Sequence, residues 1–195
     1  MEAVLYSAPS VYPVSVADIK THLRIDATDT THDDYIESLM VAIVDRVESF
    51  LGRKLITQTW DLKFSSWQDL IEDDNELPRV LPFGQTQSIT SIVYKDEDGN
   101  NQTISTDYYT LTLAGTDAAR IVFNYDDDLD DFDWPDLWSV DQITVRLVCG
   151  YGATGAAVPA PIKTAILLMV GDLFNDEDSS FAIEHLLNSY RLWRC

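Results

Sequence analysis

The feature that most constrains the fold of this chain is a change in the spacing of its apolar residues, which occurs twice. Before Gly52, apolar residues recur every three or four positions, as on the buried face of a helix. After Gly52 the spacing becomes two, as in a strand with one buried face. From Ile162 onward the helical spacing returns. Helices, then strands, then helices indicate an α+β fold rather than a series of βαβ units.

Two helices are predicted before Gly52. Ser15 is expected to cap a short helix over residues 16–23, with Asp18 three positions further on. Thr31 is expected to cap a longer helix that ends at Gly52, where a glycine suits the left-handed conformation of a C-terminal cap. The apolar residues of the longer helix are Ile36, Leu39, Met40, Ile43, Val44, Val47, Phe50 and Leu51. Their spacing predicts that one face of this helix is buried.

The centre of the chain predicts an antiparallel β unit. Alternating apolar and polar residues indicate a half-buried strand at 56–64 and another strand at 142–149. Residues 69–76 are expected to form an acidic loop. The remaining strand-like segments form two pairs, 88–95 with 101–105 and 108–113 with 120–125. Short turns join the members of each pair, which is typical of hairpins.

Helical spacing returns near the end of the sequence. Pro159 and Pro161 suit the start of a helix. Residues 162–174 are apolar on most faces, so this helix should be the central buried one. A second amphipathic segment follows at 181–193. It has no acid after Glu184 and contains the Tyr, Trp and Arg types that dominate protein interfaces, so it either folds back on the core or docks onto another protein.

These patterns predict a small bundle of N- and C-terminal helices with an antiparallel β subdomain inserted between them. The expected parts are an N-terminal arm (1–14), the first half of the helical body (15–54), the β subdomain (55–150), the second half of the helical body with the central buried helix (151–180) and a C-terminal docking segment (181–195).

The charge of the chain limits which partners it can bind, and its cysteine content indicates the compartment in which it is made. The 195 residues include 33 acidic and 13 basic side chains, which gives a net charge of −20 and a pI near 4.1. Such a surface repels phosphate backbones and anionic membranes, which excludes nucleic-acid readout through a basic patch. Cys149 and Cys195 provide neither a disulfide framework nor metal-ligand spacing, which suits a reducing cytoplasm. No signal peptide or membrane-spanning run is expected, so the protein should be soluble and made inside the cell.

Gly150, Gly152 and Gly155 match the G-x-G-x-x-G spacing of dinucleotide-binding loops. The context does not fit, because six residues separate Gly155 from the helix expected at Ile162 and no parallel strand follows that helix. The sequence therefore predicts a flexible glycine loop and no cofactor.

An acidic run at 126–133 has carboxylates at the first, third and fifth positions of a calcium-binding loop. Asp131 stands where such a loop needs glycine and Leu137 where it needs glutamate, so a solvated acidic surface is expected rather than a metal site. The residues of this predicted acidic surface are Asp126, Asp127, Asp128, Asp130, Asp131 and Asp133. Trp134 and Trp138 are expected to anchor the segment to the β unit.

The sequence predicts no catalytic residue. His22, His32 and His185 are scattered, and no serine-hydrolase, zinc-protease or phosphate-loop motif occurs. A hydrolase that uses clustered carboxylates is therefore the weakest hypothesis.

Several blocks of the sequence, taken in their order along the chain, resemble a known protein family. They are 13–24 (PVSVADIKTHLR), the helix at 35–51, 52–60 (GRKLITQTW), 150–152 (GYG), 158–168 (VPAPIKTAILL) and 186–193 (LLNSYRLW). Together these blocks resemble the head–tail connector (adaptor) family of long-tailed phages, prophages and gene transfer agents.

The resemblance implies a non-enzymatic virion protein of the head–tail interface, made in the cytoplasm of the bacterial host and without a cofactor. Family members form a ring of about a dozen subunits between the portal and a tail-side stopper protein, and double-stranded DNA passes through the ring. The helices would form the ring body and the β unit an extension. The residues that would dock onto the portal are Leu186, Leu187, Tyr190, Arg191, Leu192, Trp193 and Arg194. An acidic interaction module outside the virion, such as a DNA mimic or an assembly chaperone, is the alternative hypothesis.

Overall fold

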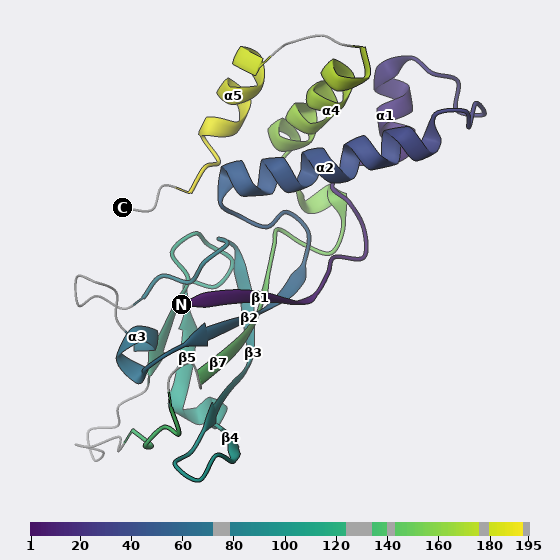
Figure 1. Ribbon diagram of the computed structural model, residues 1–195. Coiled ribbons are helices and arrows are strands. Elements are labelled where there is room, and N and C mark those ends of the chain that lie inside the picture. The colour runs from purple at the N-terminus through teal and green to yellow at the C-terminus, as the bar shows by residue number, and fades with distance from the viewer. Residues whose placement is uncertain (72–78, 124–133, 140–142, 176–179, 193–195) are drawn as a thin grey trace. The chain divides into compact units, whose positions relative to one another are not determined.

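The computed structural model describes residues 1–71, 79–123, 134–139, 143–175 and 180–192, and it divides into two compact units (Figure 1). The β unit consists of Met1–Ala8 and Gln58–Gly150. The helical unit consists of Pro9–Thr57 and Tyr151–Cys195. The fold is α+β, as the sequence predicts.

Every ladder between the strands of the β unit is antiparallel within the described residues. The strands are β1 (Glu2–Ser7), β2 (Gln58–Phe64), β3 (Thr86–Lys95), β4 (Asn101–Thr103), β5 (Tyr109–Thr112), β6 (Arg120–Phe123) and β7 (Ile143–Cys149). One sheet has the order β1-β2-β7-β3-β4, and β5 pairs with β6 in a second sheet. The two predicted hairpins correspond to β3–β4 and β5–β6.

The register of the larger sheet explains its core. Val145 in β7 lies opposite Leu62 in β2 on one side and opposite Ile92 in β3 on the other. All three side chains are fully buried. Because side chains alternate between the two faces of a strand, this register places the apolar set of each strand on one face.

Residues 2–7, predicted as part of an extended arm, form the edge strand β1 of this sheet. Leu5 pairs with Trp60 of β2. On the exposed face, the Arg146 guanidinium forms a two-pronged ion pair with Asp61, with Nε–Oδ1 and Nη2–Oδ2 distances of 2.7 and 2.8 Å. The same guanidinium lies 3.3 Å from the ring centroid of Tyr6. This stacking joins β1 to β7 across β2.

The prediction of an acidic loop at 69–76 is wrong for the first residues of that range. A short helix, α3 (Trp67–Ile71), occupies its first residues because Trp67 and Leu70 are buried in the core of the β unit. The Trp67 indole Nε1–H donates to the carbonyl of Pro135 at 2.8 Å. The Trp134 ring lies 5.0 Å from that of Trp67, which confirms that Trp134 anchors its segment to the β unit.

Within the described residues the helical unit contains four α-helices and one 3-10 helix, Gly155–Ala157. The α-helices are α1 (Val16–Leu23), α2 (Asp33–Leu51), α4 (Ala160–Asn175) and α5 (Ser180–Asn188). The helix α4 packs against α1, α2 and α5, and its Ile162 and Ile166 are fully buried. This confirms that α4 is the central helix. Leu55 and Ile56, expected near the start of a strand, lie in this core instead, where Ile56 bridges to Gly152.

The sequence locates the ends of α1 and α2 closely. The Ser15 backbone N–H and hydroxyl both donate to the Asp18 carboxylate, at 2.9 and 2.7 Å, and the Asp18 N–H donates to the Ser15 hydroxyl. This reciprocal arrangement is a capping box. Gly52 ends α2 with a φ of +68°. The prediction that Thr31 caps α2 is wrong, because the helix begins one residue later and His32 holds the N-cap position, without a side-chain cap hydrogen bond. The Thr31 N–H donates to the Asp29 carboxylate in the preceding loop.

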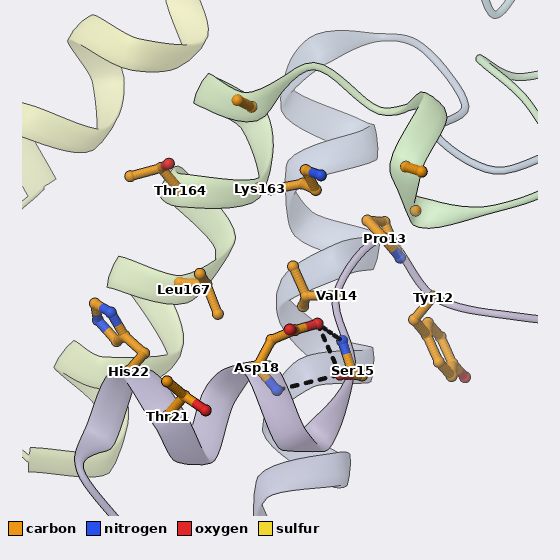
Figure 2. A pocket seen from close by; sticks show the side chains of 13 residues that line it. Tyr12, Pro13, Val14, Ser15, Asp18, Thr21, His22, Lys163, Thr164 and Leu167 are labelled. Atoms are coloured by element: carbon orange, nitrogen blue, oxygen red, sulfur yellow. Dashed lines mark hydrogen bonds between the residues drawn. The ribbon is translucent and has the colours of Figure 1, made fainter.

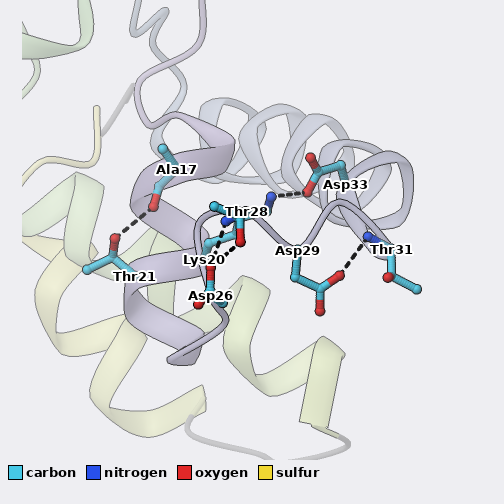
Figure 3. A network of polar contacts seen from close by, with 8 residues as sticks. All are labelled: Ala17, Lys20, Thr21, Asp26, Thr28, Asp29, Thr31 and Asp33. Carbon is cyan, nitrogen blue, oxygen red and sulfur yellow. Dashed lines mark hydrogen bonds and ion pairs between the residues drawn. The ribbon is translucent and has the colours of Figure 1, made fainter.

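The connection between α1 and α2 is held by polar contacts (Figure 3). Lys20 is buried, with 5% of its surface exposed. Its ammonium group lies 2.5 Å from the Asp33 carboxylate at the start of α2. The Asp26 carboxylate accepts from the N–H and hydroxyl of Thr28, which lowers its pKa. Lys20 thus joins α1 to the N-terminus of α2, where the helix dipole favours the negative charge of Asp33.

Replacing Ser15 with alanine should lower the free energy of unfolding by about 1 kcal/mol at pH 7. The hydrogen bonds from Ser15, with the nearby Lys163 charge as a smaller cause, lower the pKa of Asp18 from its ordinary 3.8. A lowered folded-state pKa stabilises the fold above pH 3.8, and this stabilisation is lost as the pH falls through the lowered value. The difference between wild type and Ser15→Ala should therefore shrink below pH 3.8 in denaturant titrations. A difference that is constant from pH 7 to pH 2 would contradict the role of Asp18.

Candidate functional site

The C-terminal segment lies against the rest of the helical unit. Within α5, Ile183 and Leu187 are buried in the helical core, at 6% and 4% exposure. Leu186 and Tyr190 are half-buried against the same core. Of the two arrangements left open by the sequence, the structure shows α5 folded back on its own core. In this conformation Leu187 is a core residue and does not offer its side chain to a partner.

The helix expected at 181–193 ends earlier, at Asn188. The chain turns there, with the Tyr190 N–H donating to the carbonyl of Leu187 at 2.9 Å. The Leu192 N–H then donates to the carbonyl of Leu51 at 2.8 Å, at the end of α2. This bond directs residues 190–192 across the C-terminus of α2.

Arg191 is exposed and lies over the ring of Phe50, with 4.9 Å between its guanidinium carbon and the ring centroid. Of the residues predicted to dock, Trp193 and Arg194 lie outside the described residues. The predicted acidic surface, Asp126, Asp127, Asp128, Asp130, Asp131 and Asp133, also lies outside them.

The loop at 150–155, predicted to be a flexible glycine loop, is closely packed at Gly152 and Gly155. A Cβ added at Gly155 would overlap the carbonyl oxygen of Pro13, and one added at Gly152 would lie 2.6 Å from the Cβ of Ala157. The Tyr151 N–H donates to the carbonyl of Leu55 at 3.1 Å. These glycines therefore allow close approach of the backbone within the helical unit.

Two of the three histidines, His22 and His32, pack against residues of α4. The ring of His22 lies against Gly171 of α4, where an added Cβ would be 3.3 Å from Nε2. The His32 ring meets Phe174 edge-on at 5.7 Å, and His185 is exposed on α5. Across the described ranges, no group of three or more His, Cys, Asp or Glu side chains could hold a metal ion. Nor does any helix in those ranges have the length and apolar character needed to span a membrane.

A groove of about 770 Å³ lies between α1 and α4 in the helical unit (Figure 2). Its sides are formed by Asp18, Thr21 and His22 of α1 with the N-cap residue Ser15, and by Ala160, Lys163, Thr164 and Leu167 of α4. Tyr12, Pro13, Val14, Gly155 and Ala156 complete it. Among these lining residues Asp18 carries a carboxylate and Lys163 an ammonium group, and Gly155, Ala156 and Ala160 are small.

Comparisons with known proteins identify the family of the chain. A family model described as "Phage gp6-like head-tail connector protein" matches residues 13–131, more than half of the chain. No curated protein sequence is significantly similar to the chain.

Solved structures share the fold over the whole chain. A chain from the neck of an empty gene transfer agent particle, determined with C6 symmetry, has a TM-score of 0.78 and 17% identity, with 100% of this chain and 97% of that chain covered. A chain from the virion of a native gene transfer agent particle gives 0.77 and 18% over the same shares. A third, from the neck of a native particle determined with C12 symmetry, gives 0.74 and 17% over the same shares. At these identities the likeness establishes the fold.

Proposed function

This chain belongs to the phage gp6-like head-tail connector family, and we propose on that premise that it is a structural subunit of the junction between capsid and tail. Copies of the chain form a ring beneath the portal and above a tail-side stopper protein. Double-stranded DNA passes through the ring as cargo. The protein joins the parts of the particle without chemistry of its own.

The family match is the observation that carries this proposal. The shared fold supports it, since two of the similar solved chains come from a particle neck studied with C6 and C12 symmetry. A closed ring needs a head-to-tail interface with two different surfaces on each subunit. By the same reasoning we propose about a dozen copies per ring, made in the host cytoplasm and incorporated into the virion.

The charge of the chain fits a passage for DNA. Duplex DNA carries one negative charge per roughly 1.7 Å of its axis, so a basic wall would bind it and slow its transit. The net charge of −20 instead repels the duplex. An acidic ring therefore lets DNA move through without adhering.

Mass spectrometry of purified particles tests this function directly. The chain should be present in stoichiometric amounts, and an image of the protein mixed with its portal should show a ring at the portal's tail-facing end. An acidic assembly chaperone or DNA mimic would be absent from mature particles. Particles that package and eject DNA normally without the chain would refute the connector role.

Free protein should be largely monomeric at low ionic strength. Copies of charge −20 repel one another, and salt shortens the screening length from about 30 Å at 0.01 M to about 8 Å at 0.15 M. Ring formation should therefore need both the portal and moderate salt. Sizing chromatography with light scattering at about 10 mM and 150 mM salt, with and without portal, measures this. A stable ring at low salt without portal would contradict it.

We also propose that the end of the C-terminal segment docks onto the portal. Removing the whole of 181–195 would not test this cleanly, because Ile183 and Leu187 belong to the core. The double substitution Trp193→Ala and Arg194→Ala should instead weaken portal binding about tenfold or more, as expected for Trp and Arg at an interface. Calorimetric titration against portal measures the affinity.

The matched control for this prediction is Trp138→Ala, which removes a tryptophan of the β unit that is 57% exposed. It should leave portal affinity unchanged. Equal affinities for wild type and the double variant would remove the segment from the portal interface while leaving ring membership intact.

A further inference from the structure

The helix α2 presents a second surface that the core does not use. Its buried residues, among them Ile36, Ile43 and Val47, face the rest of the helical unit. The residues exposed on its other side, here called the outer face of α2, are Asp34, Tyr35, Glu37, Ser38, Val41, Ala42, Asp45, Arg46 and Ser49. This face has three carboxylates and one guanidinium. It also carries two large exposed apolar side chains, Tyr35 at 50% and Val41 at 41% exposure.

The groove between α1 and α4 has the complementary character. Asp18 already accepts two hydrogen bonds from Ser15, at 2.9 and 2.7 Å. Lys163 interacts electrostatically with Asp18, whose pKa its charge helps to lower, but it forms no ion pair with Asp18 or with any other residue that the structure describes. The half-buried Leu167 provides apolar surface beside it. Ala156 and Ala160 leave room for another helix to approach closely.

The groove and the outer face of α2 lie on opposite sides of the helical unit. The helix α2 packs against both α1 and α4, and Figure 2 shows it behind the groove that these two helices form. Its outer face points away from them, because the buried residues of α2 occupy the side that faces α4. Tyr35 lies at the margin of this face, where its ring also meets that of Phe174 at 6.0 Å. Two different surfaces on opposite sides are what a head-to-tail ring requires.

We propose that the outer face of α2 of one copy docks into the α1–α4 groove of the next copy, and that this contact closes the ring. The proposal rests on the ring role proposed above. Ser38 and Ala42, one helical turn apart, meet the small residues of the groove, while Tyr35 and Val41 bury their apolar surface. Lys163 pairs with the carboxylates of the neighbouring α2. Opposite charges here select the correct partner surface and register.

A charge exchange tests this contact in the full-length protein assembled on its portal. Lys163→Glu places a carboxylate against an acidic helix and should lower the yield of rings about tenfold, measured by light scattering and negative-stain imaging. Glu37→Lys with Asp45→Lys reverses the other side, and combining all three substitutions should restore rings toward the wild-type yield. Lys95→Glu, an identical charge change on the exposed end of β3, should assemble like wild type. Circular dichroism confirms that each variant is folded, and Lys163→Gln, which adds no charge, should give an intermediate yield.

The outcomes separate this contact from the ring role itself. If wild type forms rings on the portal and Lys163→Glu does so equally well, or if the triple variant stays as defective as Lys163→Glu, the α2–groove contact is wrong and the connector role stands. If wild type forms no ring on the portal, both the contact and the ring role are wrong. Restoration by the triple variant alone supports direct pairing of the two surfaces.

Discussion

Leu187→Ala should destabilise the helical unit by about 2–5 kcal/mol, the usual cost of truncating a buried leucine. Leu187 is 4% exposed and belongs to the core that α4 and α2 form. The substitution removes buried methyl groups and leaves a cavity in their place. Chemical denaturation followed by far-UV circular dichroism measures the loss.

Leu173→Ala is the matched control, since Leu173 lies on α4 in the same unit but is 51% exposed. Its cost should stay within about 0.5 kcal/mol, as for most surface substitutions. If the two variants were equally stable, α5 would not be part of the core, and Leu187 would return to the residues available for docking. The pair of variants therefore decides between the two roles that the sequence leaves open for this segment.

Gly155→Ala should cost about 3 kcal/mol, at the upper end of the range for overpacking a tight site. The added Cβ would overlap the Pro13 carbonyl oxygen and lie 3.3 Å from that of Tyr12. These are backbone atoms, so no side-chain rotation relieves the clash, and the connection between residues 12–15 and α4 must shift. Denaturant titration measures the destabilisation.

Gly115→Ala separates this clash from the general cost of replacing a glycine. Gly115 has a φ of +72° and nothing within 4 Å of an added Cβ. Its substitution should cost only the roughly 1–2 kcal/mol of a left-handed alanine. A Gly155→Ala variant as stable as wild type would show that residues 150–155 are not packed against the Pro13 backbone.

Local chemistry explains the features that the sequence predicts well. The capping box at Ser15 and Asp18 depends on residues three positions apart, and the glycine cap at Gly52 depends on the conformational freedom of one residue. Likewise, the burial of α4 follows from its nearly continuous apolar surface. The alternation in β7 predicts its buried side chains, from Ile143 to Cys149. Each of these signals lies within a few neighbouring residues.

Other features depend on contacts between distant parts of the chain. Residues 2–7 form a strand of the sheet because β2, more than fifty positions later, offers a free edge for pairing. The start of the expected acidic loop is helical because Trp67 reaches Pro135 and Trp134. The groove exists because α1 and α4 lie side by side. None of these pairings leaves a periodic pattern in the local sequence.

The sequence by itself determined the order and type of the main helices and strands, the α+β class and the acidic character of the surface, since spacing, caps and charge are properties of neighbouring residues. Only the tertiary structure decided that Leu187 is buried, that the glycines of 150–155 serve close packing, and that Lys163 lies in a groove opposite the outer face of α2. Burial and complementarity depend on which distant residues pack together, and a single amphipathic segment such as α5 has the same pattern whether its partner is its own core or another protein.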